Sequence, residues 1–514
     1  MATLNKTMEN NVPSSQSDLH TIYDVHCHVF NLSHAGLLSF LNRFLHKYWL
    51  DFPQLISHPF KVIGRIMRKA LLGMGSLVLL AIVLWCAMMW WLIRKNHWVW
   101  WICCLFITAV ILGIVVKIKY KGCLRRSLNL LSVMENDAFG MFFFMELDLL
   151  TILDEMKKGI YRKPAIAKKI KSRDKLESRF RELRSAWENE KQIIVPLKRR
   201  VEPAEFIHVQ RVVITPLMMD FGFKEFDKIP GIHYSHAPRK PVREQVEDLR
   251  NGILLYKSND GNLLEIRPFI GINPSNYKLK TNSAEKTFPQ VLESYFGPEG
   301  IKYWDEKNDI NYAGIKLYPP LGFDPWPPED PADSDSNFKK VNCLYRFCQD
   351  KQIPITIHCS DGGFITCDEY FEYTDPDKWK SVLMEYPNLK INLAHMGVPA
   401  KYGKTIPEWT RIVFDLMVDR PQVYSDFSYR AYKKDFFNRL QEWISQWLKT
   451  REEKGKVELM EKLNERILFG SDFSIGLNDS ESYYEYWQTF LNSSLAPRLV
   501  QLYCQSNPRK FLGF

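Results

Sequence analysis

The 514-residue chain has no Cys-X-X-Cys pair and no regular cysteine spacing, although it contains ten cysteines. Scattered cysteines in a long chain argue against a disulfide framework and favour free thiols in a reducing compartment. Low-complexity tracts and internal repeats are also absent. The beginning of the sequence is polar and has no apolar core of the kind found in signal peptides. We therefore expect a globular protein whose residues 1–20 form a disordered polar tail.

Acidic residues are missing from residues 59–127, which contain eleven Lys or Arg and no Asp or Glu. Residues 156–200 contain sixteen Lys or Arg against five Asp or Glu. Each of these segments thus has a net charge of +11, while the whole chain has only +10, which leaves −12 for the remainder. Because this main body is acidic, we expect no nucleic acid among its partners.

Charged side chains are also absent from two apolar runs, residues 71–93 and residues 98–116. As helices these runs would be about 34 and 28 Å long, which is enough for the core of a bilayer. They predict a transmembrane hairpin, with a buried helical pair as the alternative. Nine Lys or Arg flank the hairpin and two lie in its turn, which predicts a membrane location with both termini on the cytoplasmic side. The basic segment 156–200 is expected to be helical and either to contact anionic lipid or to present a solvated face.

Short apolar runs of the kind typical of buried parallel strands recur outside these segments. They lie at residues 23–30, 208–219, 264–273, 312–320, 353–360, 389–397, 422–429 and 466–473. Helical patterns at residues 337–351 and 436–464 lie between some of them. This alternation predicts an α/β fold, a (β/α)8 TIM-like barrel formed by residues 21–35 and 201–514. Residues 36–200 are then a large, mostly helical insertion after the first strand, and this insertion carries the hairpin.

Two histidines, His26 and His28, stand one residue apart in the first strand, YDVHCHVF. Side chains alternate across a strand, so both imidazoles should point the same way and Cys27 the other way. Two neighbouring imidazoles are half of a metal site. Further polar residues lie at or near the carboxyl ends of later strands, namely Lys316, His358, His395 and Asp472. Because these ends form one face of a barrel, we expect all of these side chains to converge there.

The ordered motifs DVHCH, GIKLYPP, ITIHCSDGG, LAHMG and LFGSDF resemble the amidohydrolase superfamily. The resemblance is greatest to its amidohydrolase-related branch, which includes aminocarboxymuconate semialdehyde decarboxylase, and the closing SNPRKFLGF is similar to the ending of that branch. It covers residues 21–31 and roughly 205–514. The resemblance implies one divalent metal, most plausibly Zn²⁺, bound by His26, His28, His358 and Asp472. It also implies catalytic roles for Asp472, which accepts a proton from the attacking water, and for His395, which orients that water or polarises the substrate.

Lys316 has two interpretations. In two-metal members of the superfamily a lysine of the fourth strand is carboxylated and bridges the ions, and His395 would then bind the second metal. We favour one metal, with Lys316 as a cation that contacts the substrate. Residues that follow or end the strands are further candidates for the pocket: Tyr318, Asp361, Phe364, Tyr429 and Arg430. Among these, Arg430 has the charge to bind a substrate carboxylate.

These features together predict a membrane-anchored, metal-dependent hydrolase that faces the cytoplasm. It would cleave a C–N or C–O bond of a small polar substrate by means of a metal-activated water. One alternative is a metal-dependent non-oxidative decarboxylase that uses the same site. Another is a catalytically inactive, membrane-tethered binding or scaffold protein. The expected partners are a small-molecule substrate and, through the hairpin and the basic segment, membrane lipid, and the oligomeric state is left open.

Overall fold

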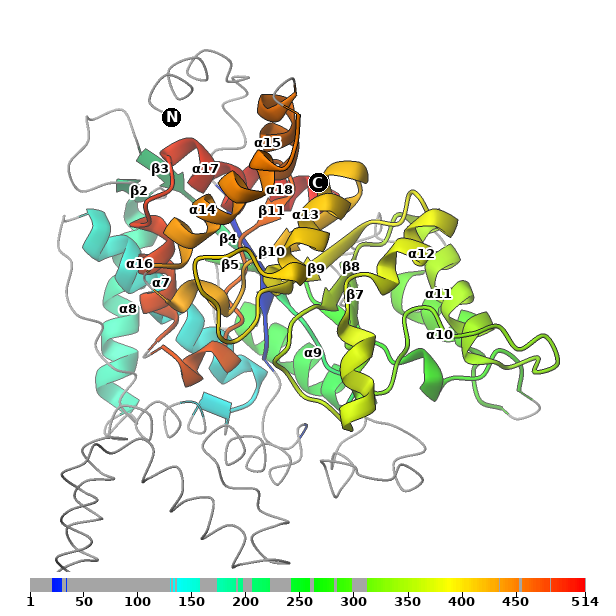
Figure 1. Ribbon diagram of the computed structural model, residues 1–514. Helices are drawn as coiled ribbons and strands as arrows, with labels where there is room; N and C mark the ends of the chain where they lie inside the picture. Colours follow the sequence, from blue (N-terminus) through cyan, green and yellow to red (C-terminus); the bar gives the residue numbers. More distant parts are fainter. Residues whose placement is uncertain are drawn as a thin grey trace, which may run out of the picture.

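The molecule has an α/β fold in which most strands are parallel and helices pack around them (Figure 1). The computed structural model describes residues 21–29, 34, 130, 133–134, 136–157, 173–190, 193–196, 206–221, 242–258, 263–281, 284–297, 312–433, 435–452, 455–480 and 482–513. Every run predicted to be a strand contains one. The prediction of an α/β fold with parallel strands is therefore confirmed.

The parallel strands form a sheet of six, in the order β11-β10-β9-β8-β7-β6, and a sheet of three, in the order β1-β4-β5. Their bounds are β1 Thr21–Cys27, β4 Arg211–Pro216, β5 Leu264–Ile266, β6 Phe269–Gly271, β7 Gly314–Leu317, β8 Ile355–His358, β9 Ile391–Ala394, β10 Val423–Asp426 and β11 Ile467–Leu468. Isolated parallel bridges connect the two sheets, one between Leu217 and Phe269 and one between Cys27 and Phe473. The first strand therefore lies beside the residues that follow the last one.

The strands of the larger sheet are buried along their length. All residues of β7, β8, β9 and β10 are buried, as expected for parallel strands covered on both faces.

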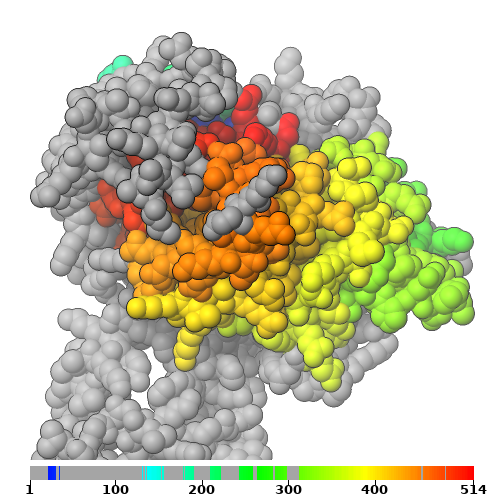
Figure 2. All heavy atoms as spheres, turned by 45° about the horizontal axis from the view of Figure 1, so that its top comes forward, coloured from blue at the N-terminus to red at the C-terminus, as the bar shows by residue number. Residues whose placement is uncertain are grey.

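The helices of the fold are α7 Ala138–Lys157, α8 Arg173–Glu190, α9 Val242–Ser258, α10 Phe288–Phe296, α11 Asn337–Lys351, α12 Lys378–Glu385, α13 Glu408–Asp419, α14 Phe436–Lys449, α15 Lys456–Asn464, α16 Tyr483–Leu491, α17 Pro497–Gln501 and α18 Asn507–Leu512. In Figure 2, α14 and α15 (orange) lie on the outer surface.

The predicted helix over residues 337–351 is α11 with the same bounds. The helical pattern over residues 436–464 corresponds instead to two helices, α14 and α15. The second helix begins after Gly455, which has a φ of +109°. This left-handed conformation is accessible to glycine at low cost, so the chain can change direction there.

The C-terminal motif holds the last strand in place. Asn507, at the start of α18, donates hydrogen bonds from its side-chain amide to the carbonyl oxygens of Asn464 at 2.8 Å and Ile467 at 2.7 Å. These carbonyls belong to the end of α15 and the start of β11. The closing SNPRKFLGF segment therefore fixes the strand that leads to Asp472.

Helices α7 and α8 belong to the predicted insertion, and α7 packs on α8, α9 and α16 (Figure 1). The helical prediction for residues 156–200 is confirmed over α8 and wrong over Ile193–Pro196. These four residues form strand β2, which pairs antiparallel with β3, Phe206–Val209. The Ile-Ile-Val sequence of β2 is rich in β-branched residues, which favour strands over helices.

The predicted membrane location, with the barrel and both termini on the cytoplasmic side, requires correction. No helix among the described ranges has both the length and the apolar character needed to cross a bilayer. The longest of them, α7, carries Glu146, Asp148 and Asp154 along its length. The predicted transmembrane runs, residues 71–93 and 98–116, lie outside the described residues.

Candidate metal centre

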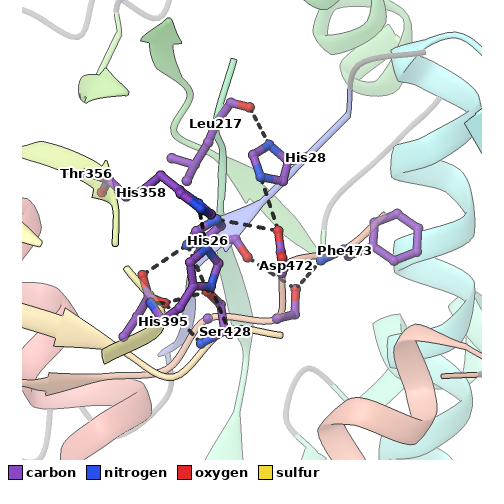
Figure 3. Close-up of polar contacts among 12 residues, drawn as sticks. His26, His28, Leu217, Thr356, His358, His395, Ser428, Asp472 and Phe473 are labelled. Atoms are coloured by element: carbon purple, nitrogen blue, oxygen red, sulfur yellow. Dashed lines mark hydrogen bonds and ion pairs between the residues drawn. The ribbon is translucent and has the colours of Figure 1, made fainter. Parts of the chain in front are cut away.

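His26 of β1 and His28 just after it converge on one carboxylate oxygen of Asp472, which follows β11 (Figure 3). Oδ1 of Asp472 lies 3.5 Å from Nε2 of His26 and 3.1 Å from Nε2 of His28. The two imidazole rings are 5.2 Å apart. The peptide N–H of Asp472 also donates to the carbonyl oxygen of His26 at 2.6 Å. The strand order thus brings together residues that are more than 400 positions apart in the sequence.

The outer nitrogens of both histidines have hydrogen-bond partners that fix the rings. Nδ1 of His26 lies 3.0 Å from the Asp426 carboxylate, and Nδ1 of His28 lies 2.8 Å from the carbonyl oxygen of Leu217. A carboxylate and a carbonyl accept hydrogen bonds, so each Nδ1 carries the proton and each Nε2 presents a lone pair. Metal-binding histidines in proteins are usually held by such a second contact.

The protonation states suit metal ligands. Burial lowers the pKa of His28 and lowers that of His395 well below its usual value. Burial alone would raise the pKa of Asp472, but its contacts with His28 and His26 outweigh burial and lower the pKa to about 2. At neutral pH His28 and His395 therefore offer neutral imidazoles beside an ionised Asp472 carboxylate, the forms that bind a metal.

A divalent cation fits this arrangement. A neutral imidazole has one N–H, so His28 can donate to the Leu217 carbonyl or to the Asp472 carboxylate but not to both. Burial disfavours the doubly protonated ring, which could donate to both. Nε2 of His26 is buried and has no hydrogen-bond partner within the described part of the chain. The ligand atoms of His26, His28 and Asp472 lie within 4.8 Å of one another. Ligand atoms around a tetrahedral zinc ion are roughly 3.4 Å apart, which is close to the separations seen here.

His358 and His395 lie next to this group. The ring of His395 is 5.0 Å from that of His26, and His358 pairs in register with Ala394, the residue before His395. Their inner nitrogens, Nδ1 of His358 and Nε2 of His395, are 3.2 Å apart. The outer nitrogens face the carbonyl oxygens of Gly362 at 2.6 Å and Ser428 at 3.0 Å. With both outer nitrogens donating, two neutral rings would present lone pairs to each other, so this pair also favours a cation or proton between them.

The structure also groups His26 with His395 and Asp426, whose ligand atoms lie within 4.8 Å of one another. His358 belongs to neither three-residue group among the described residues. The predicted role of His358 as a metal ligand therefore stays a prediction.

Three of the residues predicted for the site have the left-handed backbone conformation that residues other than glycine rarely adopt. The φ angles are +68° at His395, +63° at Tyr429 and +60° at Asp472. Such conformations cost of order 1–3 kcal/mol each and are concentrated at functional sites. Their presence here is consistent with a site that fixes side-chain direction at the expense of local stability.

Three other residues predicted for the pocket lie beside His358. The ring of Tyr318 stacks on the imidazole of His358 with centroids 4.3 Å apart, and its hydroxyl accepts from the Phe364 peptide N–H at 2.8 Å. The Nζ atom of Lys316 lies 5.7 Å from the centroid of the Tyr318 ring. The structure therefore places Lys316, Tyr318 and Phe364 together at one side of the histidines.

Lys316 is 1% exposed, and its ammonium has no hydrogen-bond partner among the residues described. Burial lowers its pKa from 10.5 to about 8. The remaining pocket candidates lie after β8 and β10, where the buried Arg430 guanidinium lies 3.4 Å from the Asp361 carboxylate. The Tyr429 hydroxyl donates to Asp479. Arg430 thus has an acidic partner within the protein, whereas the charges that attract the Lys316 ammonium within the described ranges are the more distant Asp426 and Asp472.

Asp426 is a central residue that the sequence analysis missed. Its carboxylate binds His26 Nδ1, accepts from the side-chain amide of Asn392 at 2.7 Å and accepts from the peptide N–H of His395 at 3.2 Å. A signal was present in the sequence, because the tripeptide Ser-Asp-Phe occurs within the seventh predicted strand at residues 425–427 and again at the end of the eighth at 471–473.

The substitution Asp426→Asn should weaken metal binding by roughly 10- to 100-fold, the usual effect of removing a partner of a ligating histidine. An asparagine can turn its amide N–H toward His26 Nδ1, which would move the ring proton to Nε2 and block the lone pair. Competition with a chromophoric chelator measures the change. An affinity equal to that of the wild type would show that the Asp426 contact does not set the tautomer of His26.

Comparison with known proteins places part of the chain in a family model. Residues 296–514 match the model of a family described as amidohydrolase, a span that includes Asp472 but not His26 or His28. No curated protein matches the chain. The chain is similar to an uncharacterized TIM-barrel protein from Bordetella bronchiseptica, with 15% identity and a TM-score of 0.33 over 71% of this chain and 90% of that one.

Two further solved structures are similar at low identity. One is 5-carboxyvanillate decarboxylase from Novosphingobium aromaticivorans with bound manganese, at 9% identity and a TM-score of 0.33, covering 60% of this chain and 78% of that one. The other is an amidohydrolase from Mycobacterium avium subsp. paratuberculosis, at 12% identity and a TM-score of 0.31, covering 65% of this chain and 74% of that one. Residues 296–514 of this chain thus carry a domain that matches the amidohydrolase family.

Proposed function

We propose that this protein is a metal-dependent hydrolase of the amidohydrolase type, which cleaves a C–N or C–O bond of a small polar substrate. In this proposal the parallel strands close into a (β/α)8 barrel, and the site lies at their carboxyl ends. The observation that supports it most strongly is the convergence of His26, His28 and Asp472, with both outer imidazole nitrogens held by other groups. The family match of residues 296–514 is a second, independent support.

In this proposal His26, His28, His358 and Asp472 would hold one divalent metal, Zn²⁺. Such an ion supplies Lewis acidity and makes a nucleophile available at neutral pH. The Asp472 carboxylate accepts the proton of the attacking water and passes it to the leaving group. His395, whose ring is held by Ser428 through Nδ1, directs Nε2 toward the reacting group.

The substrate end of the site is cationic. The buried Lys316 ammonium has no hydrogen-bond partner among the described residues, so an anionic group of the substrate would satisfy it. Under the two-metal interpretation the same lysine, once carboxylated, would bridge the ions. A substrate carboxylate at Lys316 also favours a second candidate function, non-oxidative decarboxylation at the same metal.

Product analysis on the metal-loaded protein tests both candidates. The protein would be given amides, esters, lactones and aromatic carboxylates, with detection of released amine, alcohol, acid and CO₂. Hydrolysis products that disappear in the His26→Ala/His28→Ala variant support the hydrolase, and CO₂ alone supports the decarboxylase. Turnover that survives in this variant would contradict both, and metal binding without any turnover would favour a binding protein.

A further inference from the structure

A third acidic residue, Asp24, lies directly behind the candidate metal centre. It is fully buried in β1, two residues before His26. One carboxylate oxygen, Oδ1, accepts hydrogen bonds from the peptide N–H groups of His26 at 3.2 Å and Ser471 at 2.9 Å. Ser471 immediately precedes Asp472 in the sequence. A single oxygen atom thus binds the backbone on both sides of the site, at one ligand and next to another.

The other oxygen of Asp24 is held by a tyrosine from a helix outside the sheet. The Tyr483 hydroxyl donates to Asp24 Oδ2 at 2.7 Å. Tyr483 is the first residue of α16 and is fully buried. Its ring also packs on Phe473, the residue after Asp472, with centroids 5.2 Å apart. Tyr483 therefore supports the loop of Asp472 through one polar contact and one apolar contact.

Helix α7 holds Tyr483 in turn. The Asp148 carboxylate, in the middle of α7, accepts from the peptide N–H groups of Tyr483 at 3.1 Å and Tyr484 at 3.4 Å. These N–H groups belong to the first turn of α16, where a helix has no internal acceptors for them. An acidic side chain from a separate helix thus caps α16 and fixes the start of this helix, where Tyr483 lies.

We propose that Asp24 and Tyr483 are positioning residues of the metal centre, and that Asp148 makes helix α7 part of the support of that centre. The contacts run without a gap from Asp148 to Tyr483, to Asp24, and then to the backbone of His26 and Ser471. The inserted segment would accordingly contribute to metal affinity. This inference rests on the proposed function, since it assumes that the site binds a metal.

The variant Tyr483→Phe tests the inference, with Tyr345→Phe as its matched control. Tyr345, on α11, is also fully buried, and its hydroxyl donates to the carbonyl oxygen of Pro325 at 2.8 Å. Each variant loses one buried hydroxyl and its hydrogen bond, so we expect similar losses of thermal stability. Only Tyr483→Phe should weaken zinc binding, by roughly 10-fold or more, in competition with a chromophoric chelator.

A second pair of variants tests the contribution of α7. Asp148→Ala removes a cap from α16, and Ser336→Ala removes the side-chain cap of α11, which accepts from the Lys339 N–H at 3.4 Å. We expect lower zinc affinity in Asp148→Ala and unchanged affinity in Ser336→Ala. Asp148→Asn retains an acceptor oxygen and should restore most of the affinity. The comparison of Asp148→Ala with Asp148→Asn therefore tests the inference even if Tyr483→Phe fails to fold.

The outcomes separate this inference from the proposed function. If the wild type takes up no zinc, the proposed function fails and this inference fails with it. If the wild type binds zinc and Tyr483→Phe and Asp148→Ala bind it as tightly as their controls, the inference alone is overturned, because the contacts would then serve stability only. Weaker zinc binding confined to Tyr483→Phe and Asp148→Ala supports it.

Discussion

Replacing Asp472 with asparagine should remove most of the bound metal and lower kcat/KM by roughly 10³-fold or more, because the carboxylate is both a proposed ligand and the proposed proton acceptor. The fold should tolerate this change. Asp472 has a φ of +60°, and asparagine adopts this left-handed conformation as readily as aspartate does. Metal content and kcat/KM measured on the same preparation would test the expectation.

Asp415→Asn is the matched control for this variant. Asp415 lies on α13 and accepts from the indole N–H of Trp447 at 2.8 Å, remote from the metal centre. This control should keep both metal and activity. If Asp472→Asn also keeps its metal and remains as active as the wild type, the assignment of Asp472 as ligand and base is wrong.

The substitution Lys316→Met should stabilise the metal-free protein at pH 7. In the metal-loaded protein the same substitution should impair turnover. The Lys316 pKa falls from 10.5 to about 8 on folding, which corresponds to a cost of about 3 kcal/mol for the buried charge at 1.36 kcal/mol per pKa unit. Below pH 8 the folded protein bears this cost in full. Between pH 8 and 10.5 the folded lysine loses its proton before the unfolded one does, so the stability of the wild type should rise with pH relative to the variant.

Urea unfolding of both proteins at pH 7 and pH 10 measures this difference. We expect Lys316→Met to be more stable at pH 7 by up to about 3 kcal/mol and the gap to narrow at pH 10. Lys340→Met is the control, because Lys340 is also buried but lies 3.2 Å from the Asp335 carboxylate. That variant should gain nothing, since it leaves Asp335 without its partner. Equal stability of Lys316→Met and the wild type at pH 7 would mean that the ammonium is not costly where it lies.

The parts of the fold that sequence predicts well are those set by local pattern. Buried parallel strands are apolar throughout, so the runs that became β7 to β10 could be recognised without tertiary information. The pairing of His26 with His28 follows from the alternation of one strand. Their approach to Asp472 could be predicted because the carboxyl ends of the strands of a parallel barrel lie on one face. In the structure these three residues lie together.

The parts that sequence did not predict depend on tertiary contacts. The carbonyl oxygen that fixes His28 belongs to Leu217, and no side-chain pattern indicates a backbone partner. Asp426 was passed over because a lone aspartate at the end of a strand is common, and its partners Asn392 and His395 lie on a neighbouring strand and the residue after it. The caps and contacts of α7 were not predicted for the same reason, because Asp148 meets Tyr483 across more than 300 residues.

The metal content of each chain decides whether His26, His28 and Asp472 bind a divalent metal. The protein would be purified without added metal or chelator and measured by elemental mass spectrometry beside the His26→Ala/His28→Ala variant. We expect about one zinc ion per chain in the wild type and its loss in the variant. Two ions per chain would add Lys316 and His395 to the ligands. A wild type that holds no metal and takes up none on reconstitution would show that these three residues do not form a metal site.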